Sequence, residues 1–207
     1  MRAALLDLLL PERCAACGRP GRGLCDGCRW SALPLLLADG RPRRLAPAVV
    51  ALAAYRYDGV VADAIRSVKT PGRHGAAAGL GALLWAALDP LLGSAATWPR
   101  TWVPSTPARR RGRGADIPRL LAGGNAVPLL RRLRHARDQT ELTAARRRVA
   151  PRGAFRATGA VPSAVVLVDD VRTTGATATA AAAALRVAGA GRVLVVTLAA
   201  VEGREGG

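Results

Sequence analysis

Short apolar runs and an alanine-rich stretch alternate in the C-terminal part of the chain. Residues 164–168 form a continuous apolar run, which predicts a strand buried on both faces of a sheet. The stretch from about 176 to 188 predicts a helix that ends at Gly189 and Gly191, and residues 192–200 predict a final strand. A strand, a helix and a second strand in this order are typical of a βαβ unit on a parallel sheet.

The first half of the chain carries the same kinds of pattern. An apolar run rich in Val and Ala at 48–57 predicts a strand. Asp58 follows and can cap a helix whose apolar positions recur at helical spacing, and this helix ends at Pro71-Gly72. We expect four further elements in order: a helix at 76–92, a short strand at 101–103, a helix at 117–122 and a strand at 126–130.

Two segments lack a regular pattern. Residues 31–47 are rich in Pro, Leu and Arg and predict a linker or irregular arm. Residues 131–152 are dominated by Arg and predict a mobile loop with a short helix near 142–148. We therefore divide the chain into an N-terminal module with its linker, 1–47, and an α/β domain, 48–207.

The length of 207 residues allows one domain of typical size and a small appendage. Half of the residues are hydrophobic but only 3% are aromatic, so the core must consist of Ala, Leu and Val. No apolar run reaches the roughly 18 residues of a membrane span. The opening segment is interrupted by Asp7 and precedes no small-residue cleavage site before Cys14. We therefore expect an amphipathic helix there rather than a signal peptide, and a cytoplasmic protein.

The chain is strongly basic, with 31 Lys and Arg against 14 Asp and Glu and a net charge of +17. This charge attracts phosphates, whether in nucleic acid, nucleotides or a sugar phosphate, although solubility and codon bias are the alternative explanation. Lys69 is the single lysine, which indicates either a need for a compact ammonium group or chance. Eleven arginines gather in the segments 109–113 and 131–148, where few aromatic residues are available for base stacking.

One segment, 165–177, combines the features of a phosphate-binding loop. The apolar strand is followed by an acidic pair and by a loop, expected at 169–175, that opens the next helix. Backbone N–H groups at a helix start favour an anion, and the threonine hydroxyls add donors. Carboxylates repel phosphate but bind hydroxyl groups or Mg²⁺, so the combination predicts a ribose 5-phosphate site, with a helix-capping acidic turn as the alternative. The candidate residues are Asp169, Asp170, Thr173, Thr174, Gly175, Ala176 and Thr177.

Other nucleotide-binding and catalytic patterns are missing from the sequence. The chain contains no G-x-x-x-x-G-K-[ST] motif, which argues against a P-loop NTPase. The pair Gly79 and Gly81 lacks the third glycine of a dinucleotide fingerprint and follows no predicted strand. His74 and His135 have no ligand or triad partner nearby in the sequence, so we expect solvent or loop roles for both.

All four cysteines lie near the N-terminus as two Cys-x-x-Cys pairs. Four thiolates at this spacing can surround one Zn²⁺ tetrahedrally, and closed four-thiolate sites are structural. Disulfide pairing is the main alternative, which a reducing cytoplasm disfavours, and a redox role lacks a thioredoxin-like context. The expected ligands are Cys14, Cys17, Cys25 and Cys28.

Residues 165–177 resemble the phosphoribosyl pyrophosphate signature of type I phosphoribosyltransferases. The order of the other motifs resembles the ComF family of competence-associated, phosphoribosyltransferase-like proteins, and this resemblance runs from about Leu8 to Val201. The motifs that carry it are Pro11 with the two cysteine pairs, Tyr57, Lys69, Val103-Pro104, Arg109–Gly114, Gln139-Thr140-Glu141-Leu142 and Ala154-Phe155.

The resemblance implies a type I phosphoribosyltransferase-like α/β fold, with a parallel sheet flanked by helices and a small N-terminal zinc-binding module. It implies a protein that binds phosphoribosyl pyrophosphate or a related ribose phosphate, with Mg²⁺, and acts in natural transformation with single-stranded DNA and a helicase-like partner. The alternative is an active phosphoribosyltransferase of nucleotide or base salvage. We favour binding because residues 113–117 read Arg-Gly-Ala-Asp-Ile where the family commonly reads Arg-Gly-Phe-Asn-Gln. Candidate pyrophosphate or DNA contacts are Lys69, Arg109, Arg111, Arg113 and Arg134.

Overall fold

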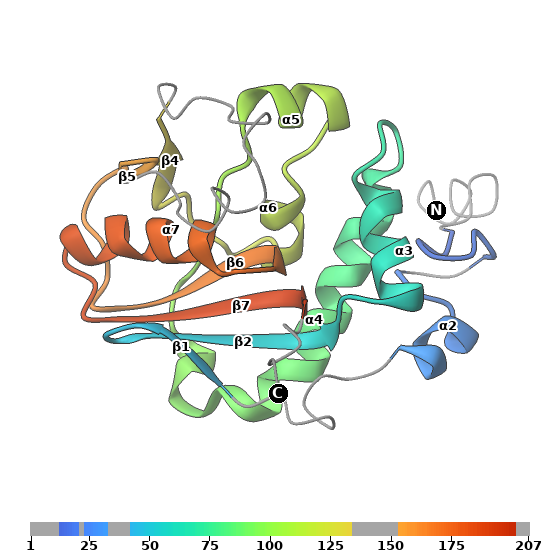
Figure 1. Cartoon of the computed structure of the whole chain (residues 1–207), viewed down its shortest axis with the longest axis horizontal. Helices are drawn as coiled ribbons and strands as arrows, with labels where there is room; N and C mark the ends of the chain where they lie inside the picture. Colours follow the sequence, from blue (N-terminus) through green and yellow to red (C-terminus); the bar gives the residue numbers. More distant parts are fainter. Residues whose placement is uncertain (1–12, 21–22, 33–41, 134–152, 202–207) are drawn as a thin grey trace, which may run out of the picture.

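The computed structural model describes residues 13–20, 23–32, 42–133 and 153–201, and its centre is a mostly parallel sheet. Five strands lie in the order β1-β2-β7-β6-β3 (Figure 1). Within this sheet, all neighbouring strands run parallel except β1, which is antiparallel to β2 at one edge. The bounds are β1 (Arg43–Ala46), β2 (Val49–Arg56), β3 (Arg100–Trp102), β6 (Ala164–Arg172) and β7 (Arg192–Ala200).

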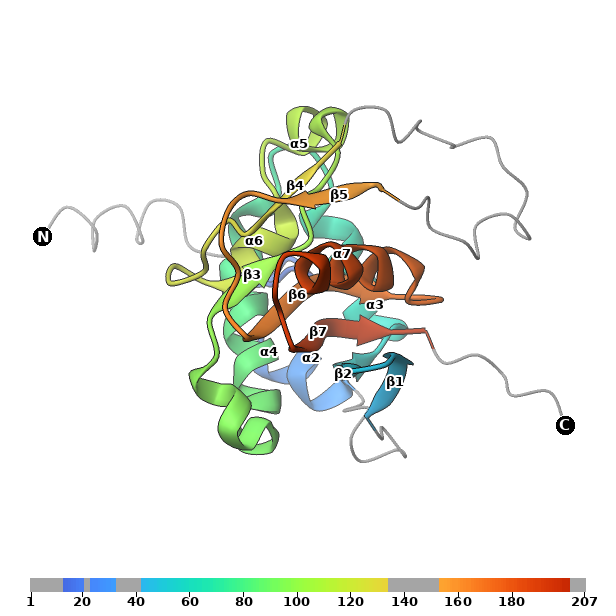
Figure 2. The same cartoon turned by 90° about the vertical axis from the view of Figure 1, so that its left-hand side faces the viewer.

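Helices cover both faces of the sheet, which explains why its central strands are apolar at consecutive positions. Val166 and Val168 of β6 pack on one face, in the same buried cluster as α3, α4 and α6. Val165 and Leu167 pack on the other face with α7 and the two-stranded sheet of β4 and β5 (Figures 1 and 2). The bounds are α3 (Gly59–Val68), α4 (Ala77–Leu92), α6 (Ile117–Ala122), α7 (Ala176–Val187), β4 (Leu130–Arg132) and β5 (Phe155–Ala157). The predicted α/β architecture and the βαβ unit of β6, α7 and β7 are confirmed.

The remaining described elements are short. The helix α2 (Asp26–Ser31) carries Cys28, and α5 (Pro107–Arg113) follows β3. The 3₁₀ turns η2 (His74–Ala76) and η3 (Gly93–Thr97) flank α4. Together these turns and α4 form a stretch, 74–97, that is long and apolar enough by composition to cross a membrane. Of the apolar 18-residue segment within this stretch, 44% is buried inside the protein.

Several sequence expectations are wrong at the level of single elements. The segment 109–113, for which the sequence predicted no helix, is part of α5, because Thr106 caps this helix by accepting the Arg109 N–H and Pro107 occupies its first position. The strand expected at 126–130 begins only at Leu130, because Pro128 has no N–H to pair. Part of the expected linker 31–47 is strand β1, whose Leu45 and Ala46 pack against the core.

Strand β6 is also longer than the sequence predicted. The loop expected at 169–175 is reduced to a turn, because pairing with β7 continues to the contact between Arg172 and Ala200. The acidic pair therefore lies on a strand and is held by its ladder. The loop with a short helix expected within 134–152 lies outside the described residues.

Candidate functional site

The acidic pair lies at the edge of the sheet where its parallel strands end, which is where open α/β sheets bind ligands. Asp169 and Asp170 are both half-buried on β6. The Asp170 N–H donates to Asp169 Oδ1 at 2.9 Å, and the Val171 N–H donates to Asp170 Oδ1 at 2.7 Å. These two bonds fix the carboxylates against the backbone and leave their other oxygens available to further partners.

Lys69 faces the acidic pair from the end of α3. This helix ends at Val68, so Lys69 is its C-cap, where the helix dipole favours a cation. Its Nζ lies 2.8 Å from Asp170 Oδ2, and the two side chains are only 24% and 15% exposed. The structure therefore brings together the single lysine of the sequence and the predicted acidic pair, at positions about a hundred residues apart.

The pKa of Asp169 is raised well above its ordinary value. Burial, and next the charge of Asp170, raise the pKa of Asp169 to about 8, although Lys69 and Arg132 act in the opposite direction. The Asp169 carboxyl therefore holds its proton to a higher pH than an ordinary aspartate does. A divalent cation placed between the two carboxyl groups would release this proton, because it favours the ionised form.

The turn after β6 opens α7 with polar groups. Thr173, Thr174 and Thr177 are all exposed, and the Ala176 N–H donates to Thr174 Oγ1 at 3.3 Å. Gly175 is the N-cap of α7 with φ +82°, a conformation that favours glycine. The Ala176 N–H is thus already engaged by Thr174, and the exposed Thr173 and Thr177 follow the acidic pair at the start of a twelve-residue helix, whose dipole favours an anion.

Two arginines approach the acidic pair from other elements. Arg113, at the end of α5, is half-buried. Burial lowers the pKa of its guanidinium below the ordinary value, although the nearby charge of Asp170 acts in the opposite direction. Arg132 of β4 donates from Nε to the Pro104 carbonyl at 3.0 Å and stacks over the Phe155 ring at 4.5 Å. Sequence analysis missed Arg132, because it assigned 131–152 to a loop and so gave this arginine no fixed position.

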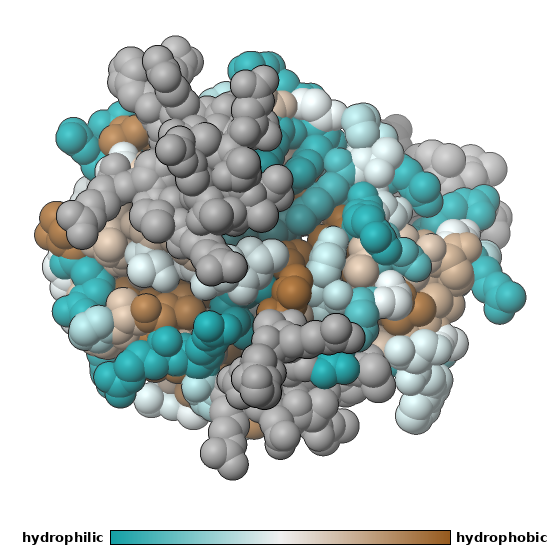
Figure 3. Space-filling model, in the orientation of Figure 1, coloured by the Kyte–Doolittle hydropathy of each residue, from teal (hydrophilic) through white to brown (hydrophobic). Residues whose placement is uncertain are grey.

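The other predicted arginines are less closely engaged. Arg109 and Arg111 are exposed on α5, and Arg134 lies outside the described residues. In Figure 3 the surface between α5 and α3, above the end of β6, is hydrophilic. The cations that the described residues place near the acidic pair are Lys69, Arg113 and Arg132.

The loop after β3 carries a contact that the sequence did not predict. Both carboxylate oxygens of Asp116, at 3.4 and 3.3 Å, accept the N–H of Ser105. Asp116 precedes α6 and is half-buried. The internal carboxylate therefore occupies a backbone donor of this loop that an anionic ligand would otherwise use.

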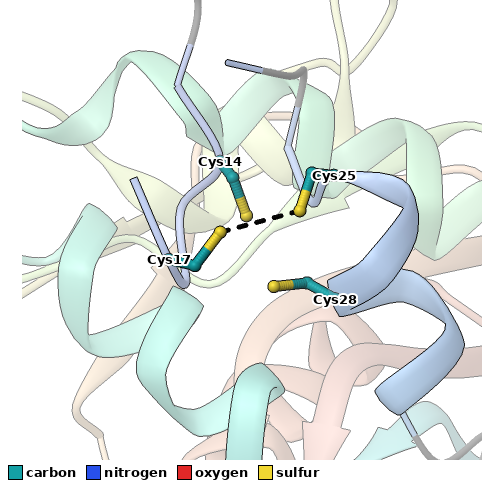
Figure 4. Close-up of side chains that lie close together, drawn as sticks. All are labelled: Cys14, Cys17, Cys25 and Cys28. Carbon is teal, nitrogen blue, oxygen red and sulfur yellow. Dashed lines mark hydrogen bonds between the residues drawn. The ribbon is translucent and has the colours of Figure 1, made fainter. Parts of the chain in front are cut away.

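The four cysteines form a compact thiol cluster, as the sequence predicted (Figure 4). Their Sγ atoms all lie within 4.8 Å of one another, and those of Cys17 and Cys25 are 3.6 Å apart. None of the four is in a disulfide. Four sulfurs around a tetrahedral ion with metal–sulfur bonds of about 2.3 Å would be roughly 3.8 Å apart, so the cluster fits an ion such as Zn²⁺.

Two thiols of the cluster have pKa values that are shifted from the ordinary value. Burial raises the pKa of Cys14, but hydrogen bonds from the backbone of Cys17 and Cys25 outweigh it and lower that pKa to about 6. Burial and the neighbouring thiols raise the pKa of Cys28 to about 12. The Cys14 thiolate thus forms easily and hinders the ionisation of Cys28, and a bound cation would favour the thiolate form of both.

The thiol cluster is packed onto the α/β domain. Cys14, Leu24 and Cys28 belong to the same buried cluster as α3 and α4. A Cβ at Gly23 would lie 2.6 Å from the Gly79 carbonyl carbon, so the two backbones are in direct contact. The thiol cluster therefore packs against α3 and α4 as part of the α/β domain.

The chain matches no family model and none of the curated proteins. Its function is therefore argued from two groups of residues in the described part of the chain. The first lies at the end of β6 and combines Lys69, the acidic pair and the turn 173–177. The second is the thiol cluster.

Proposed function

We propose that this chain is a ComF-type protein with a type I phosphoribosyltransferase-like fold, which binds phosphoribosyl pyrophosphate or a related ribose 5-phosphate. The observation that carries this proposal is the sequence of groups at the end of β6. A half-buried acidic pair on a strand is followed at once by a threonine-rich turn at the start of α7. Phosphate and sugar hydroxyl groups need donors and acceptors side by side in this way.

Each part of the ligand has a chemical counterpart. The 5-phosphate would accept hydrogen bonds from the turn 173–177, where three threonines are exposed at the start of α7. The ribose hydroxyls, or Mg²⁺ bound with them, would engage Asp169 and Asp170. Lys69 balances the charge of Asp170 before the ligand arrives and is within reach of a diphosphate afterwards.

An active phosphoribosyltransferase of nucleotide or base salvage is the alternative. It requires the loop after β3 to hold a pyrophosphate leaving group, and backbone N–H groups are the usual donors for such an anion. The Asp116 carboxylate already accepts the Ser105 N–H and would repel pyrophosphate. This contact favours ligand binding over transferase turnover.

The other parts of the proposal concern the metal and the partners. The thiol cluster would hold a structural Zn²⁺, since its four sulfurs fit a tetrahedral ion. The net charge of +17 and the exposed arginines of α5 support contacts with single-stranded DNA during natural transformation, beside a helicase-like partner. DNA that has entered the cell would be handled in the cytoplasm, and we propose that location for the protein.

The acidic pair provides the test. Asp169→Asn combined with Asp170→Asn removes two acceptors for hydroxyl groups or Mg²⁺ without changing side-chain size. Calorimetry with phosphoribosyl pyrophosphate and Mg²⁺ should show an affinity at least roughly tenfold weaker than that of the parent, since several charge-assisted bonds are lost.

A matched control keeps the charge change but moves it away from the site. Asp63→Asn combined with Asp89→Asn removes two exposed carboxylates that pair with Arg66 and Arg100. This control should bind phosphoribosyl pyrophosphate like the parent. Equal affinity of the 169/170 variant and the parent would refute the ribose phosphate site.

A further inference from the structure

A cavity lies between α4, α6 and β4, next to the edge strand β3. Its volume is about 1020 Å³, which is large enough for a small-molecule ligand. Neither the acidic pair, nor Lys69, nor the turn 173–177 lines it. The cavity therefore lies next to the groups proposed to hold the ribose phosphate, and it shares with their surroundings Arg132 and the loop after β3.

The charged residues of this cavity select an anion. Its lining, all of it in the described part of the chain, contains four arginines and one aspartate: Arg110, Arg119, Arg131, Arg132 and Asp116. The Asp116 carboxylate accepts the Ser105 N–H and is thus already engaged. Arg110, Arg119 and Arg131 are exposed, so their guanidinium groups can turn toward a ligand phosphate.

The uncharged residues of the cavity favour a planar ring. Trp102 is half-buried, and the guanidinium of Arg119 lies 5.7 Å from its ring centroid. Trp85 is held in place, because its Nε1 donates to the Leu121 carbonyl at 2.9 Å and Arg100 stacks on its ring at 3.5 Å. Two of the four tryptophans in the chain therefore line one arginine-rich cavity, although sequence analysis found few aromatic residues near the arginine clusters.

We propose that this cavity binds a nucleoside phosphate unit, with the base against Trp102 and the phosphate on the surrounding arginines. The unit would come either from a free mononucleotide or from one nucleotide of a single strand, because both present the same ring and phosphate. An indole face next to guanidinium groups provides stacking and charge for such a ligand. The mononucleotide form goes beyond the proposed function, whereas the single-strand form rests on its DNA-binding part.

Two alanines on α4 provide a matched pair of variants. Ala82 is exposed and lines the cavity, whereas Ala86 is exposed one turn later and does not line it. Ala82→Glu and Ala86→Glu change the net charge equally, and neither fills a buried position. Ala82→Glu should weaken binding by roughly tenfold or more, because it places a carboxylate among the arginines, and Ala86→Glu should bind like the parent.

The two probes are deoxyadenosine monophosphate, followed by calorimetry, and a short labelled deoxyadenosine oligonucleotide, followed by fluorescence anisotropy at low salt. A selective loss with Ala82→Glu for one probe assigns the cavity to that source. Equal affinities of the two glutamate variants for both probes, or no binding of either probe by the parent, would overturn the proposal. Phosphoribosyl pyrophosphate affinity, measured on the same variants, should not change, which separates failure of this cavity from failure of the ribose phosphate site.

Discussion

Two adjacent residues of the same type have different electrostatic roles in this protein. Asp170 forms an ion pair with Lys69, whereas burial and the charge of Asp170 raise the pKa of Asp169 to about 8. Asp169 therefore holds its proton to a higher pH than an ordinary aspartate, next to a carboxylate that is paired with Lys69. Such a pair can donate to and accept from the two hydroxyls of a ribose, and it becomes fully ionised when a divalent cation binds.

Asp169→Asn is expected to stabilise the fold, and this gain should grow with pH. The folded pKa of about 8 lies above the ordinary aspartate value of 3.8, so the folded protein binds this proton more tightly than the unfolded chain does. The stabilisation from the proton is complete below the unfolded pKa and is lost as pH rises through the folded pKa. Denaturant unfolding without Mg²⁺ should show a larger difference between variant and parent at about pH 8 than at about pH 5.

Asp63→Asn serves as the control for this measurement. Asp63 is exposed, and its carboxylate contacts Arg66 one turn along α3. Its replacement should change the free energy of unfolding by well under about 1 kcal/mol at either pH. A gain from Asp169→Asn that is the same at both pH values would contradict the raised pKa of Asp169.

At the scale of elements, the contact between the thiol cluster and α4 depends on glycine. Gly23 has φ +63°, and a Cβ there would lie 2.6 and 2.8 Å from backbone atoms of Gly79. Gly23→Ala should therefore destabilise the protein by about 1–3 kcal/mol, since backbone must move to admit the methyl group. Gly27→Ala, on the adjacent helix α2, meets nothing within 4 Å and should be neutral or slightly stabilising.

Thermal unfolding of the two alanine variants, together with measurement of their metal content, tests this contact. Gly23→Ala should lower the melting temperature by several degrees, while Gly27→Ala should not. If both variants melt like the parent, the thiol cluster is not held against α4 by backbone contact.

The elements that the sequence predicted well are those whose pattern is local. The apolar run of β6 and the spacing of α3 and α7 required no knowledge of other parts of the chain. Elements that depend on a distant partner were misplaced, as β4 was, or missed, as β1 was. The strand β4 exists through pairing of Leu130–Arg132 with Phe155–Ala157, and β1 exists through pairing with β2. Neither pairing has a signal within the segment itself.

The same distinction applies to the candidate site. The acidic pair, the threonine turn and the cysteine spacing are contiguous or regular in the sequence, and all were predicted. The Asp116 contact to Ser105 and the position of Arg132 arise from tertiary packing, so no local pattern identified them. Lys69 was notable only because it is the single lysine, and its contact with Asp170 required the fold.

At the scale of the whole molecule, the thiol cluster and the strand that carries the acidic pair share one core. Cys14 and Cys28 are buried with Leu80 and Leu84 of α4 and with Val168, the residue before the acidic pair. This core has few large side chains, since aromatic residues make up 3% of the chain. A metal ion bound by this cluster would therefore stabilise the domain that carries the acidic pair.

Removal of the metal should consequently destabilise the entire protein. Protein purified without added metal should contain close to one zinc per chain by elemental analysis, and a chelator should lower the temperature of a single unfolding transition. A loss of only about 3 kcal/mol would lower this temperature by roughly 6–12 °C in a chain of this length. Cys17→Ser should reproduce the effect without chelator, because Cys17 is exposed and its loss opens no cavity in the core. Restored zinc should recover the parent protein but not the variant. An unchanged melting temperature after complete loss of zinc would show that the domain is stable without its thiol cluster.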